Sequence, residues 1–444
     1  MKLSPQQILI CGFAAIIFAG SILLSLPFSS STGSYTNYID ALFTATSAVC
    51  VTGLIVVNTA IHWSLFGKII IALLIQIGGL GYMTLATLFV IMIGKQISLK
   101  DRLVFTEGIQ TFSFNEIKKF VVYVVKITLI FELIGVVILS IKWVPEFGLL
   151  VGLGHALFHS VSAFCNAGFS TFESNLANYV NSATVTLGIT SLIILGGIGY
   201  IVISDIYGFR ITKRLLLHTK VAVTTTLILI VTGTVLIFLL EYNNSNTLGA
   251  LPLKSKLLAA YFQSLTPRTA GFNTIDISAM TVPALFLIIG LMFIGASPSG
   301  TGGGTKTTTF VTLLAGVKAM LQGRKNVTIF KKTIPQEIVQ KSFVISVLAF
   351  VFISIITFLL LIVEGKDFIR TLFEVFSAFA TCGLSAAVGT PVSFSAFFTP
   401  LGKILVIITM FVGRLGPVTI AVAAIEENNI AARYYYAEGK IAVG

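Results

Sequence analysis

The segment FTATSAVCVTG, residues 43–53, recurs in three further forms along this 444-residue chain. The later copies are FHSVSAFCNAG at 158–168, YFQSLTPRTAG at 261–271 and FEVFSAFATCG at 373–383. Each copy begins with an aromatic residue and reaches a glycine ten residues later, and these glycines are 115, 103 and 112 residues apart. Such repetition indicates four similar structural units. Ser-Ala precedes the glycine by six and five residues except in the third copy, where Leu265-Thr266 replaces it. We expect this departure to be remote from the glycine.

The chain outside these copies has the composition of a membrane protein. Hydrophobic residues make up 56% of the sequence and charged residues 10%, against about 25% charged residues in a soluble domain. The block Ile8–Leu26 runs for 19 residues without a charge, which suffices for one crossing of a hydrocarbon layer about 30 Å thick. Only Lys2 precedes this block and no small-x-small cleavage site follows, so a spanning helix is favoured over a cleaved signal peptide.

Seven further apolar blocks bring the expected number of spanning helices to eight. They are Ile69–Ile93, Ile127–Ile141, Ala183–Ser204, Val221–Leu240, Val282–Ser299, Ser342–Val363 and Ile404–Ile425. The sequence therefore predicts an all-α polytopic membrane protein with four pseudo-repeated units around one central pore, each made of a helix, a pore helix, a filter loop and a second helix. The expected units are residues 1–95, 96–210, 211–322 and 323–427, followed by a cytoplasmic C-terminal tail at 428–444.

The net charge of +12 is concentrated in three loops, each after an even-numbered span. The clusters are Lys95, Lys100, Arg102, Lys118 and Lys119; Arg210, Lys213, Arg214 and Lys220; and Lys318, Arg324, Lys325, Lys331 and Lys332. By the positive-inside rule these loops, and with them both termini, are expected to be cytoplasmic. No folded basic face is indicated, so nucleic acid is not an expected partner. The clusters can meet anionic headgroups of the lipid bilayer or dock a soluble partner.

The four repeated segments are too short and too polar to cross a bilayer, so they must dip into it and return. Irregular backbone at membrane depth is tolerated only inside protein or beside a watery cavity. Glycine lets the chain turn carbonyl oxygens inward, and rings of carbonyls can replace the hydration shell of a monovalent cation. The preceding short helix would direct its negative C-terminal end to the same point. We therefore expect a cation selectivity filter formed by Val51, Thr52, Gly53, Asn166, Ala167, Gly168, Thr269, Ala270, Gly271, Thr381, Cys382 and Gly383.

Glycine clusters also occur in the second helices of the units. GGLGY at 78–82 and GGIGY at 196–200 are interpreted as close helix packing. In the third unit GASPSGTGGGTKTTT, residues 295–309, interrupts the helix, because five glycines and a proline cannot continue it without large cost. No strand precedes this stretch and the Walker pattern is not satisfied, so nucleotide binding there is disfavoured. We expect an intramembrane gate loop, formed by Gly295, Gly300, Thr301, Gly302, Gly303, Gly304, Thr305 and Lys306.

Two arginines lie in apolar surroundings. Arg414, in the sequence GRLGP at 413–417, is costly inside a membrane helix and is therefore a functional candidate. We expect it to bond carbonyls or hydroxyls of the gate loop and to raise an electrostatic barrier to cations; the structural alternative is an arginine that snorkels to the cytoplasmic face. Arg268, three residues before Gly271, is awkward beside a cation site. It is expected behind the loop, bonded to backbone or to a carboxylate such as Asp276.

These combined features resemble the superfamily of Trk, Ktr and HKT potassium transporters, and most nearly the membrane subunits of bacterial Ktr systems. The resemblance implies potassium uptake, often sodium-dependent, by a homodimer in the bacterial plasma membrane with one pore per protomer. It implies K+ at Gly53, Gly168, Gly271 and Gly383, and a preference for K+ because glycine rather than serine occupies the first filter position. It also implies assembly with a cytoplasmic nucleotide-binding regulatory ring of the KtrA type. No organic cofactor is expected in the chain itself.

Two other functional classes compete with this interpretation. A secondary cation transporter working by alternating access would need an ionisable residue near the membrane midplane and helix breaks at matching places in two halves. The sequence indicates a single break, and it puts Glu132 and Asp205 near span ends or in flanks. An enzyme would need a clustered nucleophile, base or metal set. The histidines at 62, 155, 159 and 218 do not form one, so no enzymatic activity is expected.

Overall fold

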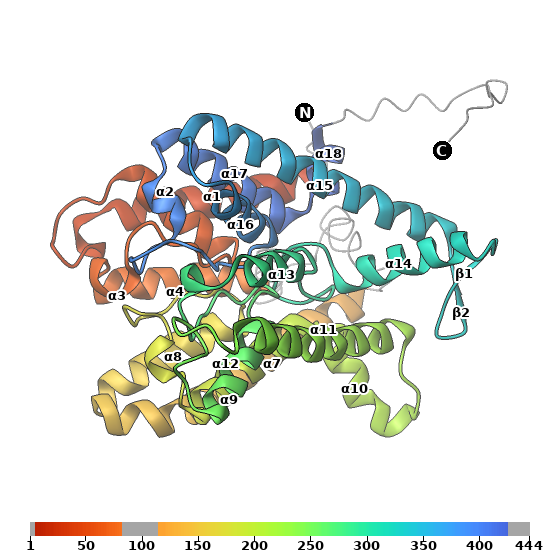
Figure 1. Ribbon diagram of the computed structural model, residues 1–444, viewed down its shortest axis with the longest axis horizontal. Coiled ribbons are helices and arrows are strands. Elements are labelled where there is room, and N and C mark those ends of the chain that lie inside the picture. Colours follow the sequence, from red (N-terminus) through yellow and green to blue (C-terminus); the bar gives the residue numbers. More distant parts are fainter. Residues whose placement is uncertain (1–4, 82–113, 425–444) are drawn as a thin grey trace.

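The structure is a computed structural model that describes residues 5–81 and 114–424, which form a helical bundle (Figure 1). The helices of the first two units are α1 (Pro5–Ser25), α2 (Tyr38–Val49), α3 (Thr59–His62), α4 (Leu65–Leu80), α7 (Phe114–Phe147), α8 (Leu149–Phe164), α9 (Ala183–Ile198) and α10 (Tyr200–Thr212). Those of the last two are α11 (Leu217–Glu241), α12 (Leu253–Leu265), α13 (Val282–Phe293), α14 (Thr307–Leu321), α15 (Gln336–Glu364), α16 (Phe368–Ala380), α17 (Pro400–Leu415) and α18 (Pro417–Ala424). The predicted all-α fold class is confirmed.

The first helix of every unit is long enough to cross a membrane. Apolar stretches of 20 to 29 residues lie in α1, α7, α11 and α15. The second helices are shorter, because α4 and α13 have fewer than 18 residues and the pairs α9–α10 and α17–α18 are bent. The predicted span Val282–Ser299 is therefore wrong in its second part, since α13 ends at Phe293. The later part of Ile69–Ile93 lies outside the described residues, as does the end of Ile404–Ile425.

The second helices of two units are broken by glycines with positive φ. Gly199 (φ 99°) separates α9 from α10 at an angle of 94°, and Gly416 (φ 89°) separates α17 from α18 at 95°. A left-handed residue cannot continue an α-helix, and Pro417 has no backbone N–H to donate to the preceding turn. The expectation of a single helix break, in the third unit, is therefore wrong. Among the interruptions within the described residues the one in the third unit is the longest, running from Phe293 to Thr307.

Carboxylates tie the first helix of a unit to the second at one end of the bundle. Glu241, at the end of α11, accepts hydrogen bonds from the backbone N (2.9 Å) and hydroxyl (2.7 Å) of Thr281, the residue before α13. Glu364, at the end of α15, accepts the same pair from Thr399 before α17, at 2.9 and 2.7 Å. Each carboxylate thereby satisfies an N–H at a helix N-terminus that has no partner within its own helix. The third and fourth units share this device.

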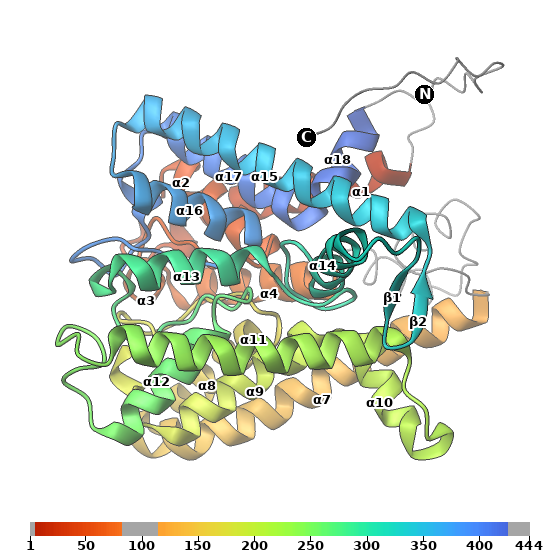
Figure 2. The same cartoon turned by 45° about the vertical axis from the view of Figure 1, so that its right-hand side comes forward.

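A small β-hairpin departs from the otherwise helical fold. Strands β1 (Val327–Ile329) and β2 (Lys332–Ile334) pair antiparallel, with Thr328 opposite Thr333. Figure 2 shows α10, the hairpin and α18 at one end of the long helices and α3 at the other. The second and third predicted basic clusters thus lie at one end of the bundle. Of the first cluster, Lys95, Lys100 and Arg102 lie outside the described residues.

Candidate functional site

Each repeated segment folds as a short helix followed by a loop that carries its glycine. The short helices α2, α8, α12 and α16 end at Val49, Phe164, Leu265 and Ala380, a few residues before glycines 53, 168, 271 and 383. Because each helix ends where its loop begins, the negative ends of the helix dipoles lie close to the four loops.

Every loop contains two residues with positive φ, the glycine and the residue two positions before it. The glycines have φ of 91°, 71°, 74° and 90°, and the earlier residues are Val51 (56°), Asn166 (59°), Thr269 (72°) and Thr381 (50°). Left-handed backbone is a genuine outlier for the β-branched members of this set. Such strain persists only where the surroundings determine the conformation, and it concentrates at functional sites.

The four glycines lie against one another in a closed ring. A Cβ added to Gly53 would lie 2.4 Å from the carbonyl oxygen of Ala167, and one added to Gly168 would lie 2.9 Å from that of Ala270. One added to Gly271 would lie 2.5 Å from the carbonyl oxygen of Cys382. The ring closes because a Cβ on Gly383 would lie 2.2 Å from the carbonyl oxygen of Thr52. Each glycine therefore faces the carbonyl that precedes the glycine of the next unit, and no side chain fits between the loops.

Hydroxyl groups of the pore helices hold the loops from behind. The hydroxyl of Ser47 accepts from the backbone N of Gly53 at 3.0 Å, and that of Ser377 accepts from Gly383 at 3.1 Å. Ser162 donates to the carbonyl of Phe169 at 2.8 Å. These serines belong to the repeated Ser-Ala pair, so the pair supports the loop. The expectation that its replacement in the third copy is remote from the glycine is therefore wrong.

The third unit supplies the same support with a shifted residue. Thr266 donates to the carbonyl of Phe272 at 2.6 Å, which is the bond that Ser162 makes in the second unit. Thr266 lies five residues before Gly271, where the other units have alanine. Its hydroxyl thus compensates for Leu265, which occupies the serine position.

Two further polar residues of the pore helices were missed by sequence reasoning. His159 is fully buried and its Nε2 lies 2.9 Å from the hydroxyl of Ser170, two residues after Gly168. Glu374 is also fully buried and accepts from the hydroxyl of Ser385 at 2.6 Å and from the backbone N of Ser395 at 2.9 Å. Both fix the chain just after a filter glycine. The available signal was an ionisable residue at the second position of the second and fourth repeated segments.

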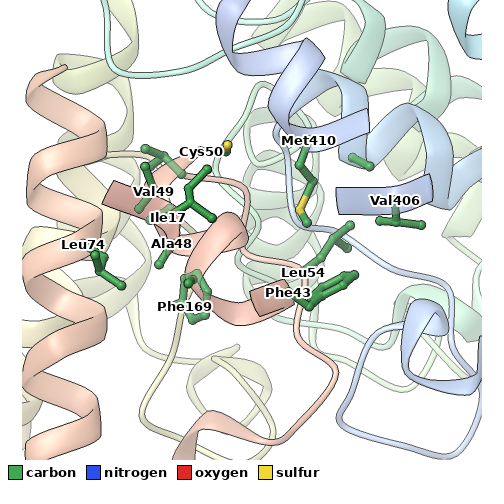
Figure 3. Packing of buried hydrophobic residues seen from close by; sticks show 14 of the residues in the cluster. Ile17, Phe43, Ala48, Val49, Cys50, Leu54, Leu74, Phe169, Val406 and Met410 are labelled. Carbon is green, nitrogen blue, oxygen red and sulfur yellow. The ribbon is translucent and has the colours of Figure 1, made fainter. Parts of the chain in front are cut away.

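Apolar packing fixes the first loop from the remaining sides. Figure 3 shows Phe43, Val49 and Leu54 of this region in one buried cluster with side chains of other helices. The other helices include α1, α4 and α17, which contribute Ile17, Leu74 and Val406. Close packing on several sides resists displacement of the backbone. The first loop of the carbonyl ring is therefore held in a closely packed surround.

A cavity of about 410 Å³ opens above the ring, and all four glycines form part of its lining. Glu173 and Asp276 also line it, and both are exposed. No lysine or arginine of the described residues lines this vestibule. Carboxylates without neighbouring cations raise the local concentration of positive ions. The vestibule is therefore suited to collecting cations at the mouth of the ring.

The glycine-rich loop of the third unit lies directly against the other side of the filter. A Cβ added to Gly302 would lie 1.9 Å from the hydroxyl of Thr269, and one added to Gly303 would lie 2.4 Å from that of Thr381. The backbone N of Gly303 donates to the Thr381 hydroxyl at 3.1 Å. Thr301 contacts the second unit, since its hydroxyl donates to the carbonyl of Phe164 at 3.1 Å. The loop thus contacts three of the four units beneath the ring.

The remaining predicted gate residues shape this loop from within. Lys306 donates from Nζ to the carbonyl of Gly302 at 2.6 Å, and Thr305 donates from its hydroxyl to the carbonyl of Phe293. The backbone N of Gly295 donates to the carbonyl of Thr305 at 2.8 Å, which closes the base of the loop. Gly300 packs on the second unit, since a Cβ there would lie 2.8 Å from the carbonyl of Gly197. Gly304 has φ of 68°.

Arg414 joins the loop to the first unit. Its guanidinium donates from Nη1 to the carbonyl of Thr301 and from Nη2 to the carbonyl of Gly78. The predicted bond to a gate-loop carbonyl is thus present, and the snorkelling alternative is wrong for this conformation. Gly78 itself packs on the pore helix, because a Cβ there would lie 2.0 Å from the carbonyl of Val49. The packing interpretation of this glycine cluster is therefore confirmed for Gly78, and for Gly79, where a Cβ would lie 2.5 Å from the sulfur of Cys165. It is wrong for Gly81, which has φ of 78°, ends α4 and would meet nothing within 4 Å.

Two sequence-based expectations about charged residues are wrong. Glu132 does not lie near the end of a span: it is in the middle of α7, is 5% exposed and accepts a weak hydrogen bond from the Cys165 thiol. The predicted span Ile127–Ile141 covered only part of this helix, since α7 runs from Phe114 to Phe147. Asp276 is not the partner of Arg268, because it lies in the vestibule and accepts hydrogen bonds from the backbone N and hydroxyl of Ser278.

Comparisons with known proteins agree with this geometry. The family model described as "TrkH: Cation transport protein" matches residues 5–432. The Ktr system potassium uptake protein B of Bacillus subtilis is 42% identical over 100% of this chain and 98% of its own length. The Ktr system potassium uptake protein B of Vibrio alginolyticus is 40% identical over 95% of this chain and 91% of its own. The potassium/sodium uptake protein NtpJ of Enterococcus hirae is 39% identical over 100% and 98%.

A solved structure supports the same fold. The potassium transporter TrkH from Vibrio parahaemolyticus superposes with a TM-score of 0.73 at 18% identity, covering 95% of this chain and 84% of that one. At this identity the likeness bears on the fold alone. The family match over residues 5–432 and the identities of 39% to 42% with the three relatives show common descent. The chain therefore belongs to the TrkH family of cation transport proteins.

Proposed function

We propose that this protein is the potassium-translocating membrane subunit of a regulated K+ uptake system. The observation that carries the proposal is the closed ring in which each filter glycine faces the carbonyl preceding the next one. A ring of backbone oxygens can replace the hydration shell of a permeating K+ ion. The relatives named as potassium uptake and potassium/sodium uptake proteins support K+ as the permeant ion and Na+ as an ion that affects transport.

Three features of the site favour cations over anions. Carbonyl oxygens carry partial negative charge, and the four pore helices direct their negative ends to the ring. The vestibule adds Glu173 and Asp276. Glycine rather than serine at position 53 leaves the first unit with the same oxygen arrangement as the other three, which favours K+.

The competing function is a secondary cation transporter that works by alternating access. Two features that this function requires are present, since Glu132 is an ionisable residue buried within α7 and α9 and α17 are both broken. What favours conduction is the continuous path, in which vestibule, carbonyl ring and gate loop follow one another. A passive pore needs only one movable obstruction, and the contacts of Gly302 and Gly303 with Thr269 and Thr381 support that role for the loop.

Glu132→Gln separates the two functions in potassium flux measurements on proteoliposomes. The glutamine has nearly the same shape but cannot carry the charge or exchange a proton. A conducting pore retains downhill K+ flux that reverses with the K+ gradient. Loss of flux with normal protein yield would favour alternating access. Glu337→Gln, at the start of α15, is the matched control.

The filter assignment is tested by Gly53→Ser, Gly168→Ser, Gly271→Ser and Gly383→Ser, each measured as K+ uptake in cells that lack their own uptake systems. Each added side chain would displace the carbonyl of the next loop and lower K+ affinity or selectivity. Gly389→Ser is the control, because Gly389 also has positive φ (67°) and lines the vestibule, but a Cβ there meets nothing within 4 Å. Unchanged K+ uptake in all four variants would sink the filter assignment.

The regulated system around this subunit is part of the proposal. We infer a homodimer with one pore per protomer, assembled with a cytoplasmic nucleotide-binding ring of the KtrA type, and residence in a bacterial plasma membrane with both termini cytoplasmic. The word "system" in the names of the Bacillus and Vibrio relatives supports additional components. The exposed basic residues of the hairpin and α10 support a cytoplasmic end. The chain is proposed to have no enzymatic activity and to use no organic cofactor of its own.

A further inference from the structure

Arg268 is a buried charge without a partner. It lies three residues before Gly271 and is 7% exposed. Its Nε has no hydrogen-bond partner, and in the two stretches of chain that the structure describes its guanidinium makes no ion pair. Asp276, the expected partner, is engaged with Ser278 in the vestibule. A charge buried this deeply is normally paired, so Arg268 calls for a counter-ion from outside the chain.

A small cavity lies where such an ion would be needed. It has a volume of about 20 Å³ and is lined by Arg268 and Leu265 of the third filter segment, four residues of α9, Ala296 and Thr226 of α11. This space is on the scale of one water molecule or one small ion. The hydroxyl of Thr226 also lacks a hydrogen-bond partner. The cavity therefore joins two unpaired polar groups, and its other lining residues include isoleucines 193, 194 and 198.

The chemistry of these groups selects the kind of ligand. Arginine can only donate hydrogen bonds, and the threonine hydroxyl is free to donate as well. Two donors that belong to residues lining one cavity, with one unit of positive charge between them, fit a small monovalent anion, whereas a water molecule would leave the charge unneutralised. A cavity of this size excludes larger oxyanions. We propose that a halide ion of the chloride class binds between the Arg268 guanidinium and the Thr226 hydroxyl.

The bound anion has a consequence for conduction, and that consequence rests on the proposed function. Arg268 immediately precedes the strained residue Thr269 and is close in sequence to the carbonyl of Ala270, which belongs to the ring. An uncompensated positive charge at this place would repel a cation in the filter. A halide behind the loop neutralises that charge. It also holds the third loop from behind, in addition to the bond that the Thr266 hydroxyl donates to the carbonyl of Phe272.

The site itself can be tested without any transport measurement. Purified full-length protein is crystallised with bromide in place of chloride, and anomalous scattering is used to locate the bromide. We expect a peak within hydrogen-bonding distance of both Arg268 and Thr226. An ordered water without anomalous signal, or an empty cavity, would overturn the proposal. This outcome would leave the K+ filter untouched, so the two ideas can fail separately.

Thermal unfolding supplies the second measurement. The melting temperature in potassium chloride or bromide should exceed that in potassium gluconate by at least about 2 °C. Arg268→Gln should abolish the difference, while the exposed Arg324→Gln should keep it. If Arg268→Gln does not fold, Thr226→Val decides the matter. That variant retains the charge and should raise the chloride concentration for half-maximal stabilisation about tenfold, as expected for the loss of one hydrogen bond. Wild-type stability that does not depend on halide contradicts the proposal.

Discussion

Replacing Arg414 with alanine should release the gate loop and raise K+ flux. In the structure, which we take as the closed conformation of the proposed gate, the Arg414 guanidinium donates to the carbonyl of Thr301 in the loop and to the carbonyl of Gly78 in the first unit. The bond to Thr301 is the one that is lost when the loop moves away, whereas the bond to Gly78 joins two helices. The variant therefore removes one charge-assisted hydrogen bond from the closed state.

The size of the effect follows from that single bond. Hydrogen bonds to charged groups contribute about 1.5–3 kcal/mol, and about 1.4 kcal/mol corresponds to a tenfold change in an equilibrium. Arg414→Ala should therefore shift the ratio of open to closed loop by about 10- to 150-fold. While the closed state dominates, the flux should rise by the same factor. Removing a positive charge near the pore acts in the same direction.

Potassium flux into proteoliposomes measures the effect on the purified chain, without a regulatory partner. Arg414→Lys keeps the charge but lacks the planar fork that can reach two carbonyls, and Arg414→Gln removes the charge and keeps a donor. If the bond to the loop dominates, the lysine variant also raises flux; if the electrostatic barrier dominates, only the neutral variants do. Arg210→Ala, exposed on α10, is the control. Wild-type flux in Arg414→Ala, with normal yield and melting temperature, would refute the assignment.

Three further outcomes are expected. Ser377→Ala should lower the selectivity for K+ over Na+, because the amide of Gly383 loses its hydrogen-bond acceptor. The selectivity is measured from flux in mixed-ion gradients. Ser354 is exposed on α15, so Ser354→Ala should leave the selectivity unchanged. Neutralising the vestibule by Asp276→Asn with Glu173→Gln should raise the K+ concentration for half-maximal uptake. That effect should be larger at 10 mM than at 100 mM ionic strength, since the screening length falls from about 30 to about 10 Å. Deletion of residues 301–305 should raise flux, because these residues contact three units beneath the filter; unchanged flux would make the loop a structural element only.

The apolar blocks and the repetition of one segment together predicted the fold class, and the repetition singled out the four glycines. Their common offset from an aromatic residue reflects a common backbone path, and backbone path is what a filter of carbonyls depends on. The order in which the loops contact one another was not predictable. It depends on how helices from distant units pack, and no local pattern records that Gly383 meets the carbonyl of Thr52.

The supporting residues were harder to identify than the glycines. Ser47 and Ser377 appeared in the repeated Ser-Ala pair, but their role depends on the helix ending at Val49 and Ala380, so that the hydroxyl reaches an amide six residues later. Thr266 made the third unit look different in sequence although it makes the same bond as Ser162. Position by position comparison of the repeats misses such a compensation between neighbouring residues.

The helix breaks show where hydropathy alone is insufficient. The apolar blocks that end at 204 and 425 continue across Gly199 and Gly416, so hydrophobicity predicts uninterrupted spans. The dipeptide Gly416-Pro417 is a strong signal for a chain turn and outweighs the apolar pattern. At Gly199 the reason is tertiary, because a Cβ there would lie 2.4 Å from the carbonyl of Pro298 in the gate segment. Glu132 was misplaced because the polar start of α7 hid the true length of that helix.

The contact between Gly383 and Thr52 joins the first unit of the chain to the fourth, and this has a consequence for biosynthesis. Around it, Ile55 and Ser393 exchange hydrogen bonds of 2.8 and 2.9 Å, and Lys403 pairs with Asp40 at 2.7 Å. This seam between first and fourth units can form only after about nine tenths of the chain has entered the membrane. A ribosome-bound intermediate with three units has no complete ring and no selective path for ions. The chain thus postpones its conductive state until translation is nearly finished, by which time the gate loop of the third unit has already been made.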